Sequence, residues 1–466
     1  MFRLFGQDLP VKSAVLVFSE MVLLATTIIV ASWLRLGDPA LFHDYIGQDY
    51  FLLKISTVLA VCFICFYYND LYDLHTVSKR WELIIRLMQA LGAACIILAL
   101  VYYFFPDLML GRGVFAISAI IGAATLVAWR LFLDASVTFF RPEQKVLIAG
   151  TGSAGLRLIQ ELKSHPELHF KIVGVLSENG AGKEQALAET DVLGHVTDVE
   201  RIAGDARVDY VVLSLAERRG QMPVQQLLRL KVAGRIRVED AHGMYERLTG
   251  RIMLEKLSPS ALIFSEGFRK TALQRLMKRG IDTSIACVGL VVCAPLMLFT
   301  ALAIYIESGK PIFFRQRRIG YKGRDFDMLK FRSMRRDSEK DGAKWAAQQD
   351  SRITRVGKFI RKFRIDEMPQ FLNVLRGDMA IVGPRPEQPL LVQMLEEKIP
   401  FYPERHAVRP GITGWAQIRF QYGASIADAE TKLEYDLFYI KHLSPLFDLA
   451  IAFRTVQVMF FGKGAV

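Results

Sequence analysis

Two adjacent carboxylates, Asp366 and Glu367, stand in a cationic stretch of the sequence between Arg361 and Pro369. Proline is typical of the first turn of a helix, so we expect both acids at or just before a helix N-terminus, where anions are favoured. Such a pair can hold a hard divalent cation such as Mg²⁺, and one member can act as a nucleophile that forms an acyl phosphate. The alternative is structural: one acid caps the helix, and both form surface ion pairs.

The cations around this pair belong to a long basic tract. The 466 residues include 59 Lys+Arg and 47 Asp+Glu, of which 18 and 6 lie between Lys310 and Ile365. This tract therefore accounts for the whole net charge of +12. It favours an anionic partner, which is nucleic acid, an anionic membrane surface or a phosphorylated substrate. Because no nucleic-acid-binding motif is recognisable, we expect no nucleic acid.

The first 140 residues are predicted to form four transmembrane helices. The chain is 52% hydrophobic and 23% charged with a mean hydropathy of +0.24, which excludes a disordered chain. Four apolar segments approach the roughly 20 residues that span a bilayer; they are residues 13–34, 51–68, 83–105 and 114–132. Lys and Arg are concentrated in the second connector and after the fourth segment, which predicts that both ends of this block are cytoplasmic.

A fifth apolar segment, residues 281–306, contains Pro295 and has basic residues on both sides. Basic flanks stay on the cytoplasmic side of a membrane. We therefore expect a re-entrant helix that enters one leaflet and turns back at the proline, which removes a backbone donor and kinks a helix. The alternatives are a fully spanning helix that tolerates the proline and a buried helix of a soluble core.

A glycine turn follows a strand-like run at residues 145–149, between these membrane segments. The turn carries three glycines: Gly150, Gly152 and Gly155. A helical pattern and strand-like runs at 170–176 and 210–213 follow, which predicts an α/β Rossmann-like domain over residues 141–265. The turn either binds a nucleotide or only forms the fold of a regulatory domain. No Tyr-x-x-x-Lys pair follows it, which counts against the alternative of a membrane-anchored NAD-dependent nucleotide-sugar dehydratase or epimerase.

From about Thr271 to the end, the sequence resembles the bacterial sugar transferase family, the polyprenyl-phosphate hexose-1-phosphate transferases. Six ordered blocks carry the resemblance: the apolar segment with Pro295, Lys330-Phe-Arg-Ser-Met, Asp366-Glu-x-Pro-Gln, Asn373-Val-Leu-x-Gly-Asp-Met, Val382-Gly-Pro-Arg-Pro and Arg409-Pro-Gly-Ile-Thr-Gly-Trp-Ala-Gln. The whole layout is similar to the long subgroup, of the exopolysaccharide or undecaprenyl-phosphate glucose phosphotransferase type. The implied fold class is a membrane α-helical N-terminal bundle, an α/β Rossmann-like domain and, over residues 266–466, a mostly α monotopic catalytic domain with a re-entrant helix.

The resemblance also implies a reaction. A hexose-1-phosphate passes from a UDP-sugar to undecaprenyl phosphate and UMP is released, which initiates exopolysaccharide, capsule or O-antigen synthesis. In this scheme Asp366 is the nucleophile that carries a covalent phosphosugar, and Glu367 helps it to bind Mg²⁺. The matching blocks assign phosphate binding to four cations: Lys330, Arg332, Arg361 and Arg385.

One segment departs from the family pattern. Shorter relatives have an Asn-Gly-Arg-like turn after the Gly-x-x-Gln block, where this chain has Ile418-Arg-Phe-Gln-Tyr-Gly. We expect Arg419 to take the place of that arginine in substrate binding. The departure leaves the sugar open, and the long subgroup favours UDP-glucose or UDP-galactose.

The location follows from the substrates that the resemblance implies. Nucleotide sugars are cytosolic, and the lipid phosphate lies at the inner-leaflet surface. We therefore expect a multi-pass protein of the bacterial cytoplasmic (inner) membrane, with its catalytic domain in contact with membrane lipid on the cytoplasmic face. A homo-oligomer is compatible with the sequence, and a non-enzymatic membrane scaffold is the remaining alternative.

Overall fold

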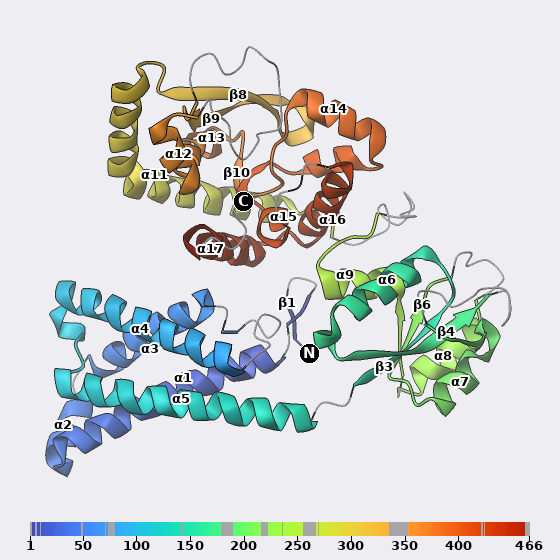
Figure 1. Cartoon of the computed structure of the whole chain (residues 1–466), viewed down its shortest axis with the longest axis horizontal. Coiled ribbons are helices and arrows are strands. Elements are labelled where there is room, and N and C mark those ends of the chain that lie inside the picture. Colours follow the sequence, from blue (N-terminus) through green and yellow to red (C-terminus); the bar gives the residue numbers. More distant parts are fainter. Residues whose placement is uncertain are drawn as a thin grey trace.

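The computed structural model of the chain consists of three groups of elements that follow one another in sequence (Figure 1). It describes residues 2–4, 7–9, 11–47, 50–69, 71–72, 80–140, 143–178, 190–215, 222–234, 236–254, 267–268, 270–334, 353–420, 423 and 425–461. Part of the basic tract, residues 335–352, lies outside the described residues. So do residues 255–266, which contain the expected end of the second domain.

Four long apolar helices form the N-terminal group, as predicted. They are α1 (Val11–Leu36), α3 (Phe51–Tyr68), α4 (Arg80–Phe104) and α5 (Arg112–Phe140), preceded by the hairpin β1 (Phe2–Leu4) and β2 (Gln7–Leu9) and accompanied by the short α2 (Pro39–Ile46). Each long helix contains an apolar window of 18 to 22 residues, enough to cross a bilayer. Inside the bundle, Arg130 of α5 donates to the Glu20 carboxylate of α1 at 2.6 Å and to the Leu71 carbonyl at 2.7 Å. This buried ion pair satisfies both charges and holds the connector after α3.

A five-stranded parallel sheet forms the second group. Its strands, in the spatial order β5-β4-β3-β6-β7, are β3 (Gln144–Ala149), β4 (Phe170–Ser177), β5 (Val192–His195), β6 (Tyr210–Leu213) and β7 (Arg237–Asp240). One face packs against α6 (Ser153–Ser164) and α9 (Ala241–Thr249), and the other against α7 (Val199–Asp205) and α8 (Val224–Val232). This strand order is that of a doubly wound α/β fold, so the predicted Rossmann-like domain is confirmed.

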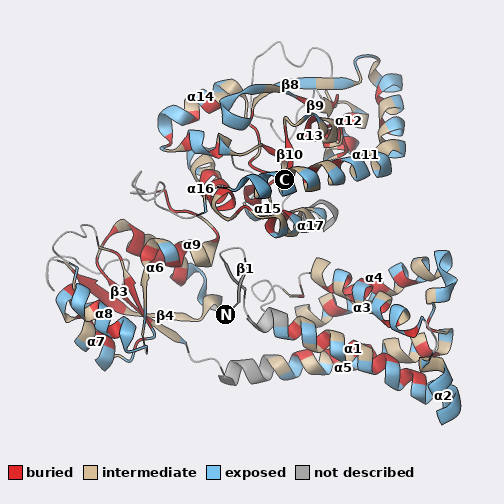
Figure 2. Ribbon diagram, turned by 180° about the vertical axis from the view of Figure 1, so that it is seen from behind, coloured by how far each residue is buried: buried red, intermediate tan, exposed pale blue. Residues whose placement is uncertain are grey.

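The third group begins with α11 (Ala272–Ser308), a helix of 37 residues that contains Pro295. It starts at a capping box formed by Thr271 and Gln274, before the predicted apolar segment. The helix changes direction within its length, and most of its surface is exposed or of intermediate burial (Figures 1 and 2). The backbone donor that Pro295 lacks is a physical cause for such a bend. Its large apolar side chains face outward, as Val291 at 75% exposure illustrates.

The remaining elements of the third group are mostly helical. The strands form two small sheets, antiparallel β8 (Phe313–Ile319) with β9 (Asp325–Phe331) and parallel β10 (Ala380–Val382) with β11 (Gly411–Thr413). The helices are α12 (Arg355–Lys362), α13 (Gln370–Arg376), α14 (Pro389–Lys398), α15 (Trp415–Arg419), α16 (Ile426–His442) and α17 (Pro445–Phe461), with the 3-10 turns η5 (Ile365–Glu367) and η6 (Tyr402–Ala407). Their shared core surrounds α16, where Leu433 and Phe438 are fully buried. The bundle meets this group at α17, where Phe453 packs against Tyr67 and Tyr68 with ring centroids 4.9 and 5.0 Å apart.

The Rossmann-like domain and the third group share a short extended segment. Ile252 and Leu254 belong to the core around α16, whereas Met253 between them belongs to the core of the Rossmann-like domain. Beside this segment, Trp415 donates its indole N–H to the Gly250 carbonyl at 2.9 Å. The segment therefore lies between two hydrophobic cores and contributes alternate side chains to each.

Candidate active site

The acid pair lies in the short turn η5, directly before α13. Arg364 has a left-handed backbone with φ 53°, which ends the run of α12 and turns the chain into η5. Pro369 stands at the N-cap of α13, next to the first turn that the sequence predicts for it, and Gly377, at φ 92°, ends the helix. Asp366 and Glu367 are each only 9% exposed. This burial does not fit the alternative in which both acids form surface ion pairs.

The bent helix α11 supports this segment from two sides. Before Pro295, Arg279 donates to the main-chain oxygens of the last turn of α13 at 2.6 and 2.9 Å. Beyond Pro295, Ile304 packs in a buried cluster with Ile365, the residue that precedes Asp366. The position of the acid pair is therefore set by both parts of the bent helix.

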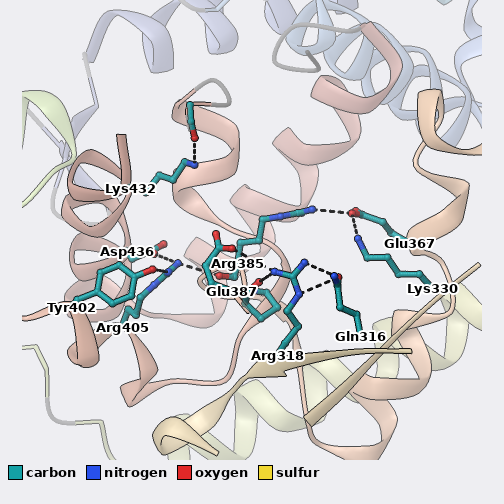
Figure 3. A network of polar contacts seen from close by, with 12 residues as sticks. Gln316, Arg318, Lys330, Glu367, Arg385, Glu387, Tyr402, Arg405, Lys432 and Asp436 are labelled. Atoms are coloured by element: carbon teal, nitrogen blue, oxygen red, sulfur yellow. Dashed lines mark hydrogen bonds and ion pairs between the residues drawn. The ribbon is translucent and has the colours of Figure 1, made fainter. Parts of the chain in front are cut away.

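Three cations surround the Glu367 carboxylate, and Figure 3 shows two of them, Lys330 and Arg385. Its Oε1 lies 3.1 Å from Lys330 Nζ and 3.1 Å from Arg385 Nη2, and its Oε2 lies 3.5 Å from Arg364 Nη1. Burial opposes ionisation of Glu367, but these cations outweigh it and hold its pKa below the usual range. Burial lowers the pKa of Lys330, and the neighbouring Glu367 opposes that change. Glu367 is therefore an ionised group that gathers cations.

Asp366 has a different environment, although it is the next residue. It forms no ion pair with any residue in the described part of the chain. Burial and then the neighbouring Glu367 charge raise the pKa of Asp366 to about 6, against the opposing charges of Lys330 and Arg361. Two adjacent carboxyls with divergent pKa values are typical of a division of catalytic roles. Asp366 is the more basic of the two and forms no ion pair within the described residues, which suits a nucleophile.

The loop that carries Arg385 is held rigidly by its main chain. Three successive carbonyls, of residues 384, 385 and 386, accept hydrogen bonds from Gly411 N at 2.9 Å, Arg405 Nη2 at 3.0 Å and Arg318 Nη1 at 3.1 Å. Arg405 in turn pairs with Asp436 of α16 at 2.8 Å, and both side chains are buried (Figure 3). These contacts fix the loop, so that the Arg385 side chain extends to Glu367 (Figure 3).

The structure brings together only some of the residues that the sequence predicts for the site. Lys330 and Arg385 lie on Glu367, and a small cavity beside them is also lined by Gln370 and Arg318. Arg361 stands in the last turn of α12, close enough to Asp366 to lower its pKa.

Two predicted phosphate ligands have other partners. Arg332 donates from Nη2 to the carbonyls of Ser308 and Gly309 at 2.7 and 2.8 Å, so it caps the C-terminal end of α11. Arg419 lies over the ring of Trp415, 4.6 Å from its centroid, where α15 meets the Rossmann-like domain. A role of either arginine in substrate binding stays a prediction.

Sequence reasoning missed three polar residues around the site, namely Arg318, Arg405 and Asp436. Arg318 belongs to the basic tract, but unlike its exposed neighbour Arg317 it is half-buried. It donates to Gln316 at 2.7 Å. The period-two pattern of β8 contains a signal for this inward orientation. Arg405 and Asp436 are 31 residues apart, and no local spacing indicates that they pair.

The donor atoms at the acid pair fit Mg²⁺ chemically. Asp366 and Glu367 supply hard oxygen donors, and Mg²⁺ commonly takes one or two carboxylates together with substrate phosphates and water. Within the described residues there is no group of three or more His, Cys, Asp or Glu suited to enclose a metal. The residues therefore fit a Mg²⁺ that arrives with a phosphorylated substrate better than a permanently enclosed ion.

The glycine turn of the Rossmann-like domain packs against Ser214, at the end of β6. Gly155 N donates to Ser214 Oγ at 2.7 Å, and Gly152 N donates to the Ser214 carbonyl at 2.8 Å. A Cβ placed on Gly150, Gly152 or Gly155 would lie within 2.6 Å of an atom of Ser214. The three glycines thus permit a close contact within the fold, which supports their structural interpretation.

Comparison with known proteins matches two parts of the chain. Residues 273–462 match the bacterial sugar transferase family, and residues 68–232 match a CoA-binding domain family. The UDP-N-acetylgalactosamine-undecaprenyl-phosphate N-acetylgalactosaminephosphotransferase of Aeromonas hydrophila is 42% identical over 56% of this chain, which spans 61% of that relative. The UDP-glucose:undecaprenyl-phosphate glucose-1-phosphate transferase of Escherichia coli (strain K12) is 33% identical over 69% of each chain. The protein of the same name from Xanthomonas campestris pv. campestris is 30% identical over 92% of this chain and 90% of its own.

Proposed function

This chain belongs to the bacterial sugar transferase family, and from that premise we propose that it transfers a hexose-1-phosphate from a UDP-sugar to undecaprenyl phosphate. The product is a lipid-linked sugar diphosphate and the released nucleotide is UMP. Such a reaction starts the assembly of an exopolysaccharide, capsule or O-antigen repeat unit. Relatives are named for glucose and for N-acetylgalactosamine, which supports a UDP-hexose donor. We propose UDP-glucose, UDP-galactose or UDP-N-acetylgalactosamine.

One observation carries the mechanism: among the residues that the structure describes, Glu367 forms ion pairs with three cations and Asp366 beside it with none. Asp366 Oδ attacks the sugar-bearing phosphorus of the UDP-sugar, and the bond to the UMP phosphate oxygen breaks. The lipid phosphate oxygen then attacks the same phosphorus, and the aspartyl–phosphorus bond breaks to regenerate Asp366. One site thus serves a soluble donor and a lipid acceptor in turn, which predicts ping-pong kinetics.

The cations around Glu367 take part through their charge. Charge spreads over the phosphoryl oxygens in such a transfer, so positioned cations are the main source of stabilisation. Lys330 and Arg385 already converge on one carboxylate oxygen, and both line the cavity beside it. We infer that they hold the diphosphate of the donor.

Mg²⁺ is part of the proposal. Asp366 and Glu367 would hold the ion, and when bound it would neutralise phosphate charge on the donor. Lys330 and Arg385, which both contact Glu367 Oε1, would keep this carboxylate oriented for that role. Chelation of divalent cations is expected to stop UMP release, and added Mg²⁺ to restore it.

We also propose a cytoplasmic position for the site. The bend of α11 and the proline within it support a re-entrant course, with both helix ends on the cytoplasmic face of the inner membrane. The acid pair is held between the two parts of α11, so a re-entrant course would place it at the membrane surface near both substrates. Labelling of single cysteines at Lys270 and Lys310 tests this: both positions are expected to react from the cytoplasmic side only.

The deciding experiment measures UMP release from UDP-glucose, UDP-galactose and UDP-N-acetylgalactosamine, with undecaprenyl phosphate and Mg²⁺. Wild type is expected to release UMP from one donor in a lipid-dependent manner, whereas Asp366→Asn is not. Glu396→Gln, an exposed acid on α14, is the matched control and is expected to behave as wild type. Full release by Asp366→Asn would contradict the covalent mechanism.

A further inference from the structure

Helix α16 carries two buried carboxylates that face different parts of the molecule. Glu434 is fully buried and Asp436 is 1% exposed. Glu434 points to the Rossmann-like domain, and Asp436, two residues later, points to η6 and the loop of Arg385. Helix α16 thus contacts the Rossmann-like domain through Glu434 and, two residues later, reaches the loop of the candidate active site through Asp436 and Arg405.

The Glu434 contact crosses the domain boundary. Arg157 lies in the second turn of α6. Its Nη1 is 2.9 Å from Glu434 Oε1. The Ile252 amide donates to the Glu434 carbonyl at 3.1 Å, and the Leu254 amide lies 3.5 Å from Oε1. The Arg157 guanidinium also stacks over Tyr245 of α9, 5.7 Å from the ring centroid. A buried polar group needs a hydrogen-bonding partner, and Arg157 is the nearest one to Glu434 Oε1, so the position of Glu434 depends on Arg157.

Further polar contacts fix the end of α16 on the same domain. Glu246 of α9 accepts from Lys441 Nζ at 2.8 Å and lies 2.8 Å from His442 Nε2. Figures 1 and 2 both place α6 and α9 next to α16. Two residues before Arg157, Gly155 donates to Ser214 Oγ, and this hydrogen bond attaches the same end of α6 to its own sheet. Helix α16 therefore rests on a fixed part of the Rossmann-like domain.

Three contacts connect Asp436 to the acid pair. Asp436 Oδ2 accepts from Arg405 Nη2 at 2.8 Å, and the same nitrogen donates to the Arg385 carbonyl at 3.0 Å. The Arg385 side chain then reaches Glu367 at 3.1 Å (Figure 3). Because Arg405 bridges α16 and the loop, a displacement of α16 would be transmitted to Arg385.

We propose that Arg157 is a positioning residue of the transferase: through Glu434 it holds α16 in the register that lets Asp436 and Arg405 place Arg385 at the phosphate site. The proposal rests on the proposed function, because it takes Arg385 as a ligand of the donor diphosphate. It gives the Rossmann-like domain a role in donor binding that needs no ligand in its glycine turn. Packed interiors transmit such shifts because they deform little without changing contacts.

The test compares two neutralised arginines of the Rossmann-like domain in the full chain. Arg157→Gln removes the contact with α16, and Arg229→Gln removes the exposed pair with Glu200 at 2.8 Å, which does not involve the catalytic domain. We expect Arg157→Gln to raise the KM for the UDP-sugar by about three- to tenfold with kcat nearly unchanged. Arg229→Gln is expected to change neither. Arg157→Lys keeps the charge and is expected to recover part of the loss.

A double substitution tests the route through Arg405. Independent effects of Arg157→Gln and Arg405→Lys would multiply their fold-changes in KM. If Arg157 acts through Arg405, the KM of the double variant will rise by less than this product. Equal KM values for wild type and Arg157→Gln, or equal shifts in Arg157→Gln and Arg229→Gln, would overturn the proposal. So would a loss of kcat with unchanged KM, which indicates only fewer folded molecules.

An activity-independent measurement separates this inference from the proposed function. Hydrogen exchange of the segment 383–387 is expected to be faster in Arg157→Gln than in wild type or Arg229→Gln. If wild type releases no UMP from any donor, the proposed function fails, and this exchange comparison alone decides whether Arg157 positions the Arg385 loop. Unchanged exchange in Arg157→Gln would overturn the link.

Discussion

Asp366 with Glu367 and Glu434 with Asp436 are both pairs of buried carboxylates, yet they are partnered in opposite ways. On α16, each acid has its own arginine, at 2.9 and 2.8 Å. In η5, three cations gather on Glu367, and Asp366 has no ion-pair partner in the described chain. Burial raises the pKa of Asp366 to about 6 and that of Glu434 to about 7. The same residue types thus hold a fold together where each acid has its own arginine, and favour chemistry where one acid has no ion-pair partner in the described chain.

The largest effect is expected from Asp366→Asn, which removes the unmatched acid. UMP release should fall by at least about a thousandfold, because the nucleophile is lost. Burial opposes ionisation of Asp366, so a neutral amide should leave the thermal stability at pH 7 unchanged or higher. Activity and the melting temperature of the purified protein are measured together. A large drop in melting temperature would place Asp366 with the structural acids.

The opposite result is expected on α16. Asp436→Asn leaves Arg405 buried without its carboxylate, which costs about 3–5 kcal/mol of stability. Thermal unfolding in detergent measures the change. Asp205→Asn, which breaks the exposed pair with Arg201 at 3.7 Å, is the control and should cost less than about 1 kcal/mol. If both substitutions had equally small effects, the Arg405–Asp436 pair would not be a structural contact.

Glu367→Gln removes the carboxylate charge that binds three cations. This charge is the main difference between the acid pair in η5 and the one on α16. We expect UMP release to fall about 10- to 100-fold, because Lys330 and Arg385 lose their common acceptor. Kinetics at saturating Mg²⁺ give the size of the loss. A variant with wild-type kcat and KM would show that these cations need no carboxylate to orient them.

The smallest effect concerns pH. Asp366 must be ionised to attack, so kcat/KM of the donor reaction should fall about tenfold per pH unit below roughly pH 6. The Glu367 charge raises the pKa of Asp366, so in Glu367→Gln this acid limb should move to lower pH. Initial rates between pH 5 and 8 in both proteins test this. An acid limb at the same pH in both proteins would show that it does not arise from the titration of Asp366.

Local patterns in the sequence predicted the elements whose residues are close in the chain. Apolar runs located the four bundle helices, strand-like runs located β3, β4 and β6, and Pro369 located the start of α13. The motif blocks indicated Lys330 and Arg385, which the structure places on Glu367, and their role in phosphate binding stays a prediction. These residues were identifiable because proline, glycine and charge spacing act within a few positions.

Contacts between distant segments could not be predicted in the same way. Nothing near Arg405 indicates a pairing with Asp436, and nothing near Arg157 indicates Glu434. The contact of Arg332 with the end of α11 has the same origin, since it depends on how β9 lies against that helix. Such pairs are decided by the packing of whole elements, which single-sequence periodicity does not encode.

The extended segment at residues 252–254 has a consequence for how the protein melts. Ile252 and Leu254 complete one core, and Met253 completes the other. Unfolding of either core therefore displaces a backbone segment that the other core needs. The Rossmann-like and catalytic parts should therefore unfold in one cooperative calorimetric transition, although the sequence divides them. A cut made directly after residue 254 would separate the catalytic part from two of its own core side chains.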